Sequence, residues 1–165
     1  MKKETIKELL IYLGIIVFVV LLRTFIITPV RVDGTSMNST LNDGDIMILN
    51  KINYRFNDIE RFDIVVIKYY KERFIKRVIG LPGETIKYID NELYINNIKV
   101  EEHFLQEETD DYSYEGFIPE NCYFVMGDNR RDSLDSRSFG CVNKEEILGS
   151  ANLVLFPFKN FGMKK

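Results

Sequence analysis

The spacing of apolar residues divides the chain into two parts. Residues 9–22 (LLIYLGIIVFVVLL) form one uncharged and almost wholly apolar run. Beyond about residue 28, apolar residues come in short bursts or alternate with polar ones, and turn residues separate the bursts. A long uninterrupted run predicts a helix, whereas short runs bounded by turn residues predict strands. We therefore expect an N-terminal helix followed by a mainly β region.

The apolar run reaches the length of a membrane span when its flank is included. Its 14 residues would form a helix of about 21 Å, shorter than a hydrocarbon core of roughly 30 Å. Extension to Ile27 gives 19 residues and about 28 Å, with Arg23 near the far end, where a long basic side chain can reach the interface. The run therefore predicts a transmembrane anchor.

Three other interpretations of the run fit less well. A buried core helix is rarely apolar on every face in so small a domain. A cleaved signal peptide would be followed by a small-x-small cleavage site, whereas this chain continues RTFIITPVRV. An interfacial helix would need a polar face, which the run lacks. We therefore expect the anchor to remain uncleaved.

The basic residues that flank the run indicate its orientation. Three lysines precede it, namely Lys2, Lys3 and Lys7. Fewer basic residues follow, with Arg23 near the far end. Because basic residues accumulate on the cytoplasmic side, the amino terminus is expected in the cytoplasm. Residues 1–27 would then be the cytoplasmic terminus and single-pass anchor in the cell membrane, and residues 28–165 the extracytoplasmic domain.

Short strands bounded by turns are expected throughout the second part. The candidate strands are VRV, DIMILN, RFDIVVIKYY, RFIKRVIG, CYFVMG and ANLVLFPF, the last interrupted by Pro157. Residues 85–100 (TIKYIDNELYINNIKV) predict three more strands joined at residues 90–91 and 96–97, because Asn and Asp tolerate the positive φ of tight turns. So many short strands need their edges covered, so we expect a closed or two-layered, mostly antiparallel β architecture.

Two polar segments interrupt the strands. Residues 101–116 are acidic and poor in apolar side chains, which predicts an exposed loop. Residues 127–140 (GDNRRDSLDSRSFG) predict a long polar loop, and residues 144–149 (KEEILG) predict one short helical turn.

The composition narrows the classes of partner and cofactor. A length of 165 residues with 45% hydrophobic residues fits one ordinary domain with a packed core. The net charge of −3 argues against nucleic acid as a partner. Cys122 and Cys141 have no C-x-x-C spacing and no clustered histidines beside them, so we expect neither a zinc site nor another metal or cofactor.

A disulfide between Cys122 and Cys141 is also not expected. Cys122 begins the strand that leads into the polar loop of residues 127–140, and Cys141 follows that loop directly. If the flanking strands pair across the loop, the cysteines are offset by about four residues, or about 13 Å. This exceeds the α-carbon separation of about 7 Å that a disulfide tolerates.

The stretch VDGTSMNSTL places Ser36 in a turn, where it could act as a nucleophile if a base lay nearby. Histidine is the usual partner of such a serine. The one histidine of the sequence, His103, lies in the acidic segment and is expected to be a solvated surface residue. Ser36 is therefore either an ordinary turn serine or the partner of a less common base.

Lysine is the remaining candidate base, provided that burial lowers its pKa from about 10.4 by several units. Lys76 meets this requirement in RFIKRVIG, because strand alternation places Phe74 and Val78 on its face. The same pattern also fits an edge strand whose basic residues point to solvent. Lys68 in DIVVIKYY is a second candidate, although the polar residues after it indicate that its strand runs into solvent.

A set of sequence boxes resembles those of the bacterial type I signal peptidases, which are membrane-anchored serine proteases with a Ser/Lys dyad. The boxes are LLRTFIITP, SMNSTL, GDI, RFDIVVIKYYKERFIKRVIGLPGE, GDNRRDSLDSRSFG and GSANLVLFPFKNFG. The resemblance covers essentially the whole chain, and boxes in this order and spacing are far more specific than one short motif. It implies a signal-peptidase-like β catalytic domain behind the anchor.

The resemblance implies a role for each matching residue. Ser36 would be the nucleophile and Lys76, rather than Lys68, the general base. Ser133 would be the hydroxyl that orients the lysine amine. The remaining members of the last box would support the site: Asp135 and Arg137 as an ion pair, with Asp128 and Asn129 shaping their loop. Without the resemblance, that loop reads equally well as a solvated turn of mixed charge.

The chain departs from the family pattern at two positions. Some relatives carry a hydroxyl donor for the oxyanion hole where this chain has Gly34, so the hole would use the backbone N–H of Ser36, with a contribution from Gly34 undecided. Ser39 stands where the family usually has proline, which is expected to leave the turn after the nucleophile freer.

The resemblance implies a membrane-anchored serine endopeptidase that removes N-terminal signal peptides from exported preproteins through an acyl-enzyme. Its partners would be preprotein signal peptides, held extended along a strand edge and cut after small-x-small motifs, and the membrane lipid. A non-catalytic, membrane-tethered binding or assembly protein with the same fold is the main alternative. A self-cleaving repressor peptidase would need a DNA-binding segment where the anchor lies.

Overall fold

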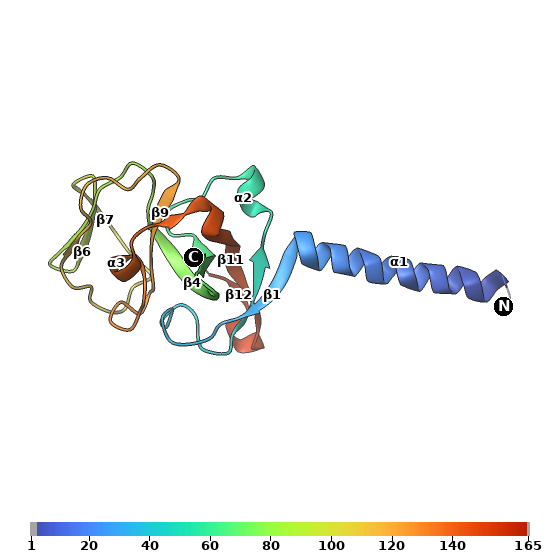
Figure 1. Ribbon diagram of the computed structural model, residues 1–165. Helices are drawn as coiled ribbons and strands as arrows, with labels where there is room; N and C mark the ends of the chain where they lie inside the picture. Colours follow the sequence, from blue (N-terminus) through green and yellow to red (C-terminus); the bar gives the residue numbers. More distant parts are fainter. Residues whose placement is uncertain (1–2, 165) are drawn as a thin grey trace.

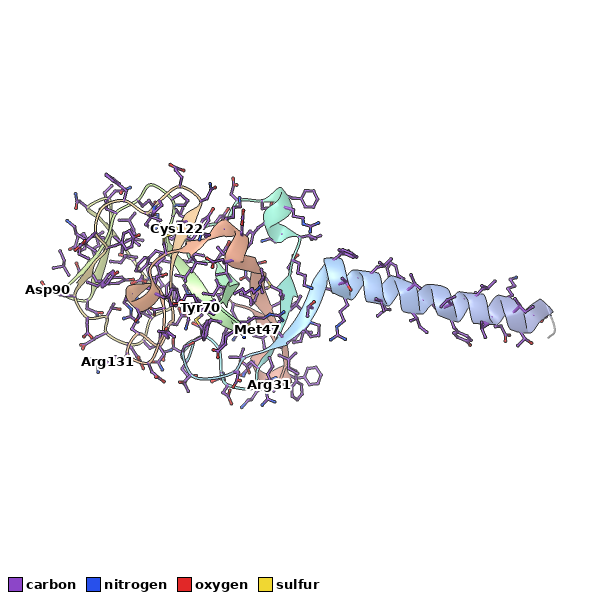
Figure 2. All side chains as sticks on the ribbon, viewed as in Figure 1. Arg31, Met47, Tyr70, Asp90, Cys122 and Arg131 are labelled. Atoms are coloured by element: carbon purple, nitrogen blue, oxygen red, sulfur yellow. A yellow bond between two sulfur atoms is a disulfide. The ribbon has the colours of Figure 1, made fainter. Side chains whose placement is uncertain are left out.

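The computed structural model describes residues 3–164, in which one long helix leads into a β region (Figure 1). Helix α1 (Lys3–Phe25) projects away from the β region, and its apolar side chains are exposed on all sides (Figure 2). The segment Glu4–Phe25 is long and apolar enough to cross a membrane by length and composition. Strand β1 begins at Ile27, so the helix ends two residues before the expected boundary. Lys2, which entered the orientation argument, lies outside the described residues.

Among these residues, the larger sheet has eight strands in the order β1-β2-β11-β3-β4-β9-β10, with β12 paired to β11. Their bounds are β1 (Ile27–Arg31), β2 (Ile46–Asn50), β3 (Ile64–Tyr69), β4 (Glu72–Gly80), β9 (Cys122–Met126), β10 (Val142–Asn143), β11 (Ile147–Phe156) and β12 (Gly162–Met163). All the pairings are antiparallel. The prediction of a mainly β, antiparallel fold behind an N-terminal helix is therefore confirmed.

A second, four-stranded sheet has the order β7-β6-β5-β8. Its strands are β5 (Ile86–Ile89), β6 (Glu92–Ile95), β7 (Ile98–Val100) and β8 (Tyr112–Ser113). The first three are the strands predicted within residues 85–100, and all four turn residues, Asp90, Asn91, Asn96 and Asn97, have positive φ. Asp90 lies at the end of the β region remote from α1 (Figure 2).

Four short helical turns connect the strands of the described region: α2 (Asn53–Phe56), α3 (Ser136–Phe139), η1 (Lys144–Glu146) and η2 (Phe158–Asn160). The predicted turn in residues 144–149 is present in its first three residues, and β11 begins at Ile147. The polar loop of residues 127–140 contains α3, and Asp135 is the N-cap residue that directly precedes this helix.

Buried apolar side chains cover both faces of the central strand β3. Ile64 and Val66 pack with Met37 and Leu41 from the turn that holds Ser36, whereas Val65 and Ile67 face a cluster that includes Val78 and Val125. A third cluster fills the space between β9 and the second sheet, around Phe124 and Tyr88. The serine turn is thus anchored by its own apolar residues.

The prediction that Cys122 and Cys141 are not linked is wrong, because the two form a disulfide with α-carbons 5.7 Å apart. The pairing of β9 with β10 places Asn143 opposite Cys122. Cys141 therefore lies two residues, rather than four, from the position opposite Cys122, and on the same face of the ladder. The bond closes the segment that contains the loop of residues 127–140.

The prediction that residues 101–116 form an exposed loop is wrong for part of the segment. Thr109 is 3% exposed, and the side chain of Glu102 is 6% exposed. The Phe104 ring packs against Phe62 with centroids 5.1 Å apart, and Tyr112 contacts the third cluster. The aromatic residues in the segment provide apolar area, and Glu102 pairs with a buried arginine, so high net charge did not keep the loop in solvent.

Candidate active site

Lys76 lies in the middle of β4, directly opposite Val65 of β3, and is 1% exposed. Its ammonium lies 5.8 Å from the centre of the Phe74 ring. The pKa of the Lys76 amine is lowered to about 8, mainly because the amine is buried. The negative charge of Asp135 acts in the other direction and raises this pKa, whereas the positive charge of Arg137 lowers it further. A substantial neutral fraction therefore exists near pH 8, which a solvated lysine does not provide.

The Lys76 amine is held by a hydroxyl from the polar loop. Its Nζ donates a hydrogen bond of 3.0 Å to Oγ of Ser133. A neutral amine that donates one hydrogen in this way has its lone pair directed elsewhere, so the contact constrains where the amine can accept a proton.

Ser36 is half-buried at the start of a turn whose next residue, Met37, is fully buried. Its carbonyl oxygen accepts a hydrogen bond of 3.1 Å from the backbone N–H of Asn129. The Asn129 side chain also donates to the Thr35 carbonyl at 3.1 Å, and the Thr35 hydroxyl donates to Asp132 at 2.5 Å. Hydrogen bonds of Thr35 and of the Ser36 backbone therefore attach the serine turn to the polar loop.

Gly127 shows how closely Ser36 and Ser133 approach. A Cβ atom on Gly127 would collide with both the Ser36 carbonyl oxygen and the Ser133 hydroxyl. Gly127 follows Met126, which pairs with Arg77, so it comes next to Lys76 across the β4–β9 ladder. The structure thus brings the Ser36 backbone carbonyl, the Ser133 hydroxyl and the strand of Lys76 together around a position that only glycine can occupy.

Asp135 and Arg137 form a two-pronged ion pair behind this group. Arg137 donates to Asp135 through Nε at 2.9 Å and Nη2 at 2.8 Å, and Asp135 also accepts the Gly127 N–H at 3.1 Å. Burial disfavours the charged carboxylate, but the hydrogen bonds and charge of Arg137 outweigh it and lower the pKa of Asp135. Asp135 therefore stays ionised and fixes the backbone beside Ser133.

Asp128 pairs with Arg77, a residue that the sequence reasoning did not select. Arg77 donates through Nε at 2.8 Å and Nη2 at 2.6 Å, and both side chains are completely buried. Thr40 donates to the same carboxylate at 2.5 Å, and the Phe104 ring lies 3.8 Å from the guanidinium. This pair joins the lysine strand, the polar loop and the serine turn. Sequence reasoning missed Arg77 because its carboxylate partner, Asp128, lies far away in the chain.

The two departures from the family pattern have clear structural counterparts. The backbone N–H of Gly34 donates to the Asp43 carboxylate at 2.9 Å, and Gly34 has φ of +95°. The Gly34 N–H is therefore already engaged within the turn. Ser39 has φ of +86°, so its turn is not merely freer than with proline but takes a conformation that proline cannot adopt.

The other candidates from the sequence lie away from this group. Lys68 is exposed near the end of β3, opposite Arg73. His103 is also exposed, with Glu101 as a neighbour at 3.2 Å, which confirms the expectation of a solvated histidine.

Comparison with known proteins gives consistent matches over most of the chain. Residues 3–156 match the family described as "Signal peptidase, peptidase S26". Signal peptidase I of Bacillus amyloliquefaciens is 38% identical over 161 residues, covering 91% of this chain and 87% of the relative. Signal peptidase IB of Staphylococcus aureus is 33% identical over 180 residues, covering 98% of this chain and 94% of the relative.

A solved structure is similar to part of the chain. The crystal structure of a signal peptidase I from Enterococcus faecalis superposes with a TM-score of 0.54 at 38% identity. The matched region covers 57% of this chain and 97% of the Enterococcus faecalis chain.

Proposed function

The chain belongs to the signal peptidase family, peptidase S26, and we propose that it cleaves signal peptides from exported preproteins with Ser36 as nucleophile and Lys76 as general base. The family makes it a serine endopeptidase, and the non-catalytic alternative is not favoured. The observation that supports the residue assignment is the buried Lys76 amine, which is hydrogen-bonded to Ser133 and lies close to the serine turn.

The proposed reaction moves one proton between the two residues. The neutral Lys76 amine accepts the Ser36 hydroxyl proton as Oγ attacks the scissile carbonyl, and the resulting ammonium gives that proton to the leaving amine. This leaves an acyl-enzyme. Lys76 then takes a proton from water, which attacks the ester, and the proton returns to Ser36. Because Lys76 begins neutral, each step leaves the buried site with a balanced charge.

The surrounding groups would act by holding this geometry. Ser133 directs the Lys76 amine through their 3.0 Å hydrogen bond, and Asp135 fixes the Gly127 backbone between them. Negative charge that develops on the substrate carbonyl oxygen would be stabilised by the Ser36 N–H.

The substrate would bind as an extended strand. Strand β1 ends the order of the larger sheet and leads directly towards the serine turn, so a peptide could pair with exposed backbone near Ser36. Shallow apolar pockets would then select small side chains at the first and third positions before the cut.

The apolar helix α1 would hold this site at the membrane. Its exposed apolar side chains would be covered by lipid, with the lysine-rich amino terminus in the cytoplasm and the β region outside. The active site would then meet a preprotein as it emerges from the membrane.

The direct test is cleavage of a preprotein by the purified full chain in detergent, with the cut site identified by mass spectrometry. We expect one cut after a small-x-small motif. A substrate whose two small residues are replaced by bulky ones serves as the matched control and should stay intact. Equal cleavage of both substrates would contradict the proposed specificity.

A further inference from the structure

Arg130 is a buried arginine whose donors reach two distant parts of the chain. The residue is 2% exposed. Its Nη1 donates to the Tyr88 hydroxyl and to Thr109 Oγ1, both at 2.8 Å, and its Nη2 donates to Glu102 at 2.5 Å. Its Nε donates to the Gly127 carbonyl at 3.2 Å. Arg130 therefore connects the second sheet and the acidic segment of residues 101–116 to the backbone beside the candidate dyad.

The partners of Arg130 on the far side form a closed polar group. The Tyr88 hydroxyl contacts both carboxylate oxygens of Glu102 at 3.0 Å. Burial raises the pKa of Tyr88 well above its ordinary value, so the phenol stays neutral and donates to Glu102 while it accepts from Arg130. A buried cation and carboxylate with this many hydrogen bonds hold their positions closely, and removal of one leaves the other buried and uncompensated.

On the near side, Arg130 is fixed to the residues that support the dyad. Its carbonyl accepts a hydrogen bond of 2.6 Å from Arg137, the partner of Asp135. The Arg130 side chain also holds Gly127 by donating to the Gly127 carbonyl. Gly127 is the residue against which the Ser36 carbonyl and the Ser133 hydroxyl are packed. A shift of Gly127 would therefore move Ser133, and with it the hydrogen bond that orients Lys76.

We infer that Arg130 is a positioning residue, and that its buried pair with Glu102 makes the acidic segment a brace that holds Gly127 and Ser133 against Lys76. The inference rests on the proposed Ser36/Lys76 dyad. It gives the acidic segment a part in the reaction without any contact with the substrate.

A neighbouring ion pair offers a matched control. Arg131 and Glu108 join the same two segments at 3.1 Å, but their side chains are 65% and 75% exposed. Arg131 lies at the outer edge of the β region (Figure 2). Both arginines link the polar loop to the acidic segment, but the exposed Arg131 pair is of the kind that contributes little to stability.

The test compares Arg130→Gln and Glu102→Gln with Arg131→Gln, all in the full chain in detergent. The measurements are kcat and KM for preprotein cleavage, the pH profile of kcat/KM and the thermal unfolding midpoint. We expect kcat to fall about 10- to 100-fold in both buried variants with little change in KM, because the dyad is misplaced rather than the substrate site. The control Arg131→Gln should stay within about twofold of the unaltered protein.

The pH profile separates positioning from simple packing. The largest charge effects on the pKa of Lys76 come from Asp135, Arg137, Asp128 and Asp132, none of which is altered. If the brace holds the loop over Lys76, its loss admits water, the pKa of Lys76 rises and the acidic limb moves to higher pH. A variant that combines Arg130→Gln with Glu102→Gln should lose no more activity than either substitution alone, because each substitution removes the same ion pair.

Lower unfolding midpoints with unaltered kcat and acidic limb in Arg130→Gln and Glu102→Gln would overturn the inference. Arg130→Lys, which keeps the charge but not the fork of donors, should recover part of the lost activity. If Arg130→Gln does not fold, Glu102→Gln decides, because it keeps the shape of the side chain. If Ser36→Ala is inactive and Arg130→Gln is fully active in preprotein cleavage, only the brace is refuted. If Ser36→Ala is active, the dyad is refuted and the brace with it.

Discussion

The amine of Lys76 donates a hydrogen bond of 3.0 Å to the hydroxyl of Ser133, although the two residues lie 57 positions apart in the chain. One comes from the middle of a strand and the other from a polar loop. This contact requires the β4–β9 pairing, the missing side chain of Gly127 and the pairing of Asp135 with Arg137. The proposed base is thus oriented by the fold rather than by its neighbours in sequence.

The first prediction concerns pH. Burial depresses the pKa of Lys76 to about 8, and the proposed general base is the neutral amine. Activity should therefore be low in acid and rise as the pH passes about 8, then level off above it. The acidic limb of kcat/KM reports this group in the free enzyme. A limb near 10.5, the ordinary lysine value, would show that the amine is not desolvated.

The second prediction concerns the turn after Ser36. Ser39→Gly should fold at least as stably as the unaltered protein, gaining at most about 1 kcal/mol, because glycine adopts positive φ without strain. Ser39→Pro should be less stable and less active, since proline fixes φ near −65°. Urea unfolding and preprotein cleavage measure the two effects. A Ser39→Pro variant with full stability and activity would contradict the observed turn.

The third prediction concerns the buried pair of Arg77 and Asp128. Asp128→Asn should lower the free energy of unfolding by about 3–5 kcal/mol, because it leaves a buried guanidinium without its counterion. Lys99→Gln is the control, since its pair with Glu92 is exposed, and it should leave stability nearly unchanged. Equal effects from the two substitutions would show that Arg77 is not buried as described.

The fourth prediction concerns the disulfide between Cys122 and Cys141. Replacement of both cysteines by serine should lower the free energy of unfolding by about 2–4 kcal/mol, because the bond closes the loop that carries Asp128, Ser133 and Asp135. Reduction of the unaltered protein should add two hydrogens, mapped to these residues by mass spectrometry. An unchanged mass on reduction would show that the thiols were free.

Local patterns were enough to predict much of the fold. The uninterrupted apolar run predicted α1, and the Asp-Asn and Asn-Asn pairs predicted the turns between β5, β6 and β7 because their backbone preference is local. Two-residue strands such as β8 and β10 carry too little pattern to be recognised. The disulfide was missed for a similar reason, since it depends on a strand register that the sequence does not reveal.

The candidate site was only partly predictable. The apolar strand around Lys76 made it a candidate base, but the pattern alone favoured a solvent-facing edge strand, and the family resemblance was needed to choose. Arg77 and Arg130 were not selected from the sequence because their carboxylate partners, Asp128 and Glu102, are distant in the chain. Burial of a charge depends on such long-range partners, so no local window contains the signal.

The most direct measurement of the central claim is the rate of preprotein cleavage by Ser36→Ala, Lys76→Ala and Lys68→Ala, with folding checked by circular dichroism. A nucleophile and its base act as one unit, so the first two variants should be essentially inactive although folded. Lys68→Ala should keep most of the activity, because Lys68 is exposed and outside the site. Substantial cleavage by folded Ser36→Ala or Lys76→Ala, or its loss in Lys68→Ala, would contradict the assignment of Ser36 and Lys76 as the catalytic dyad.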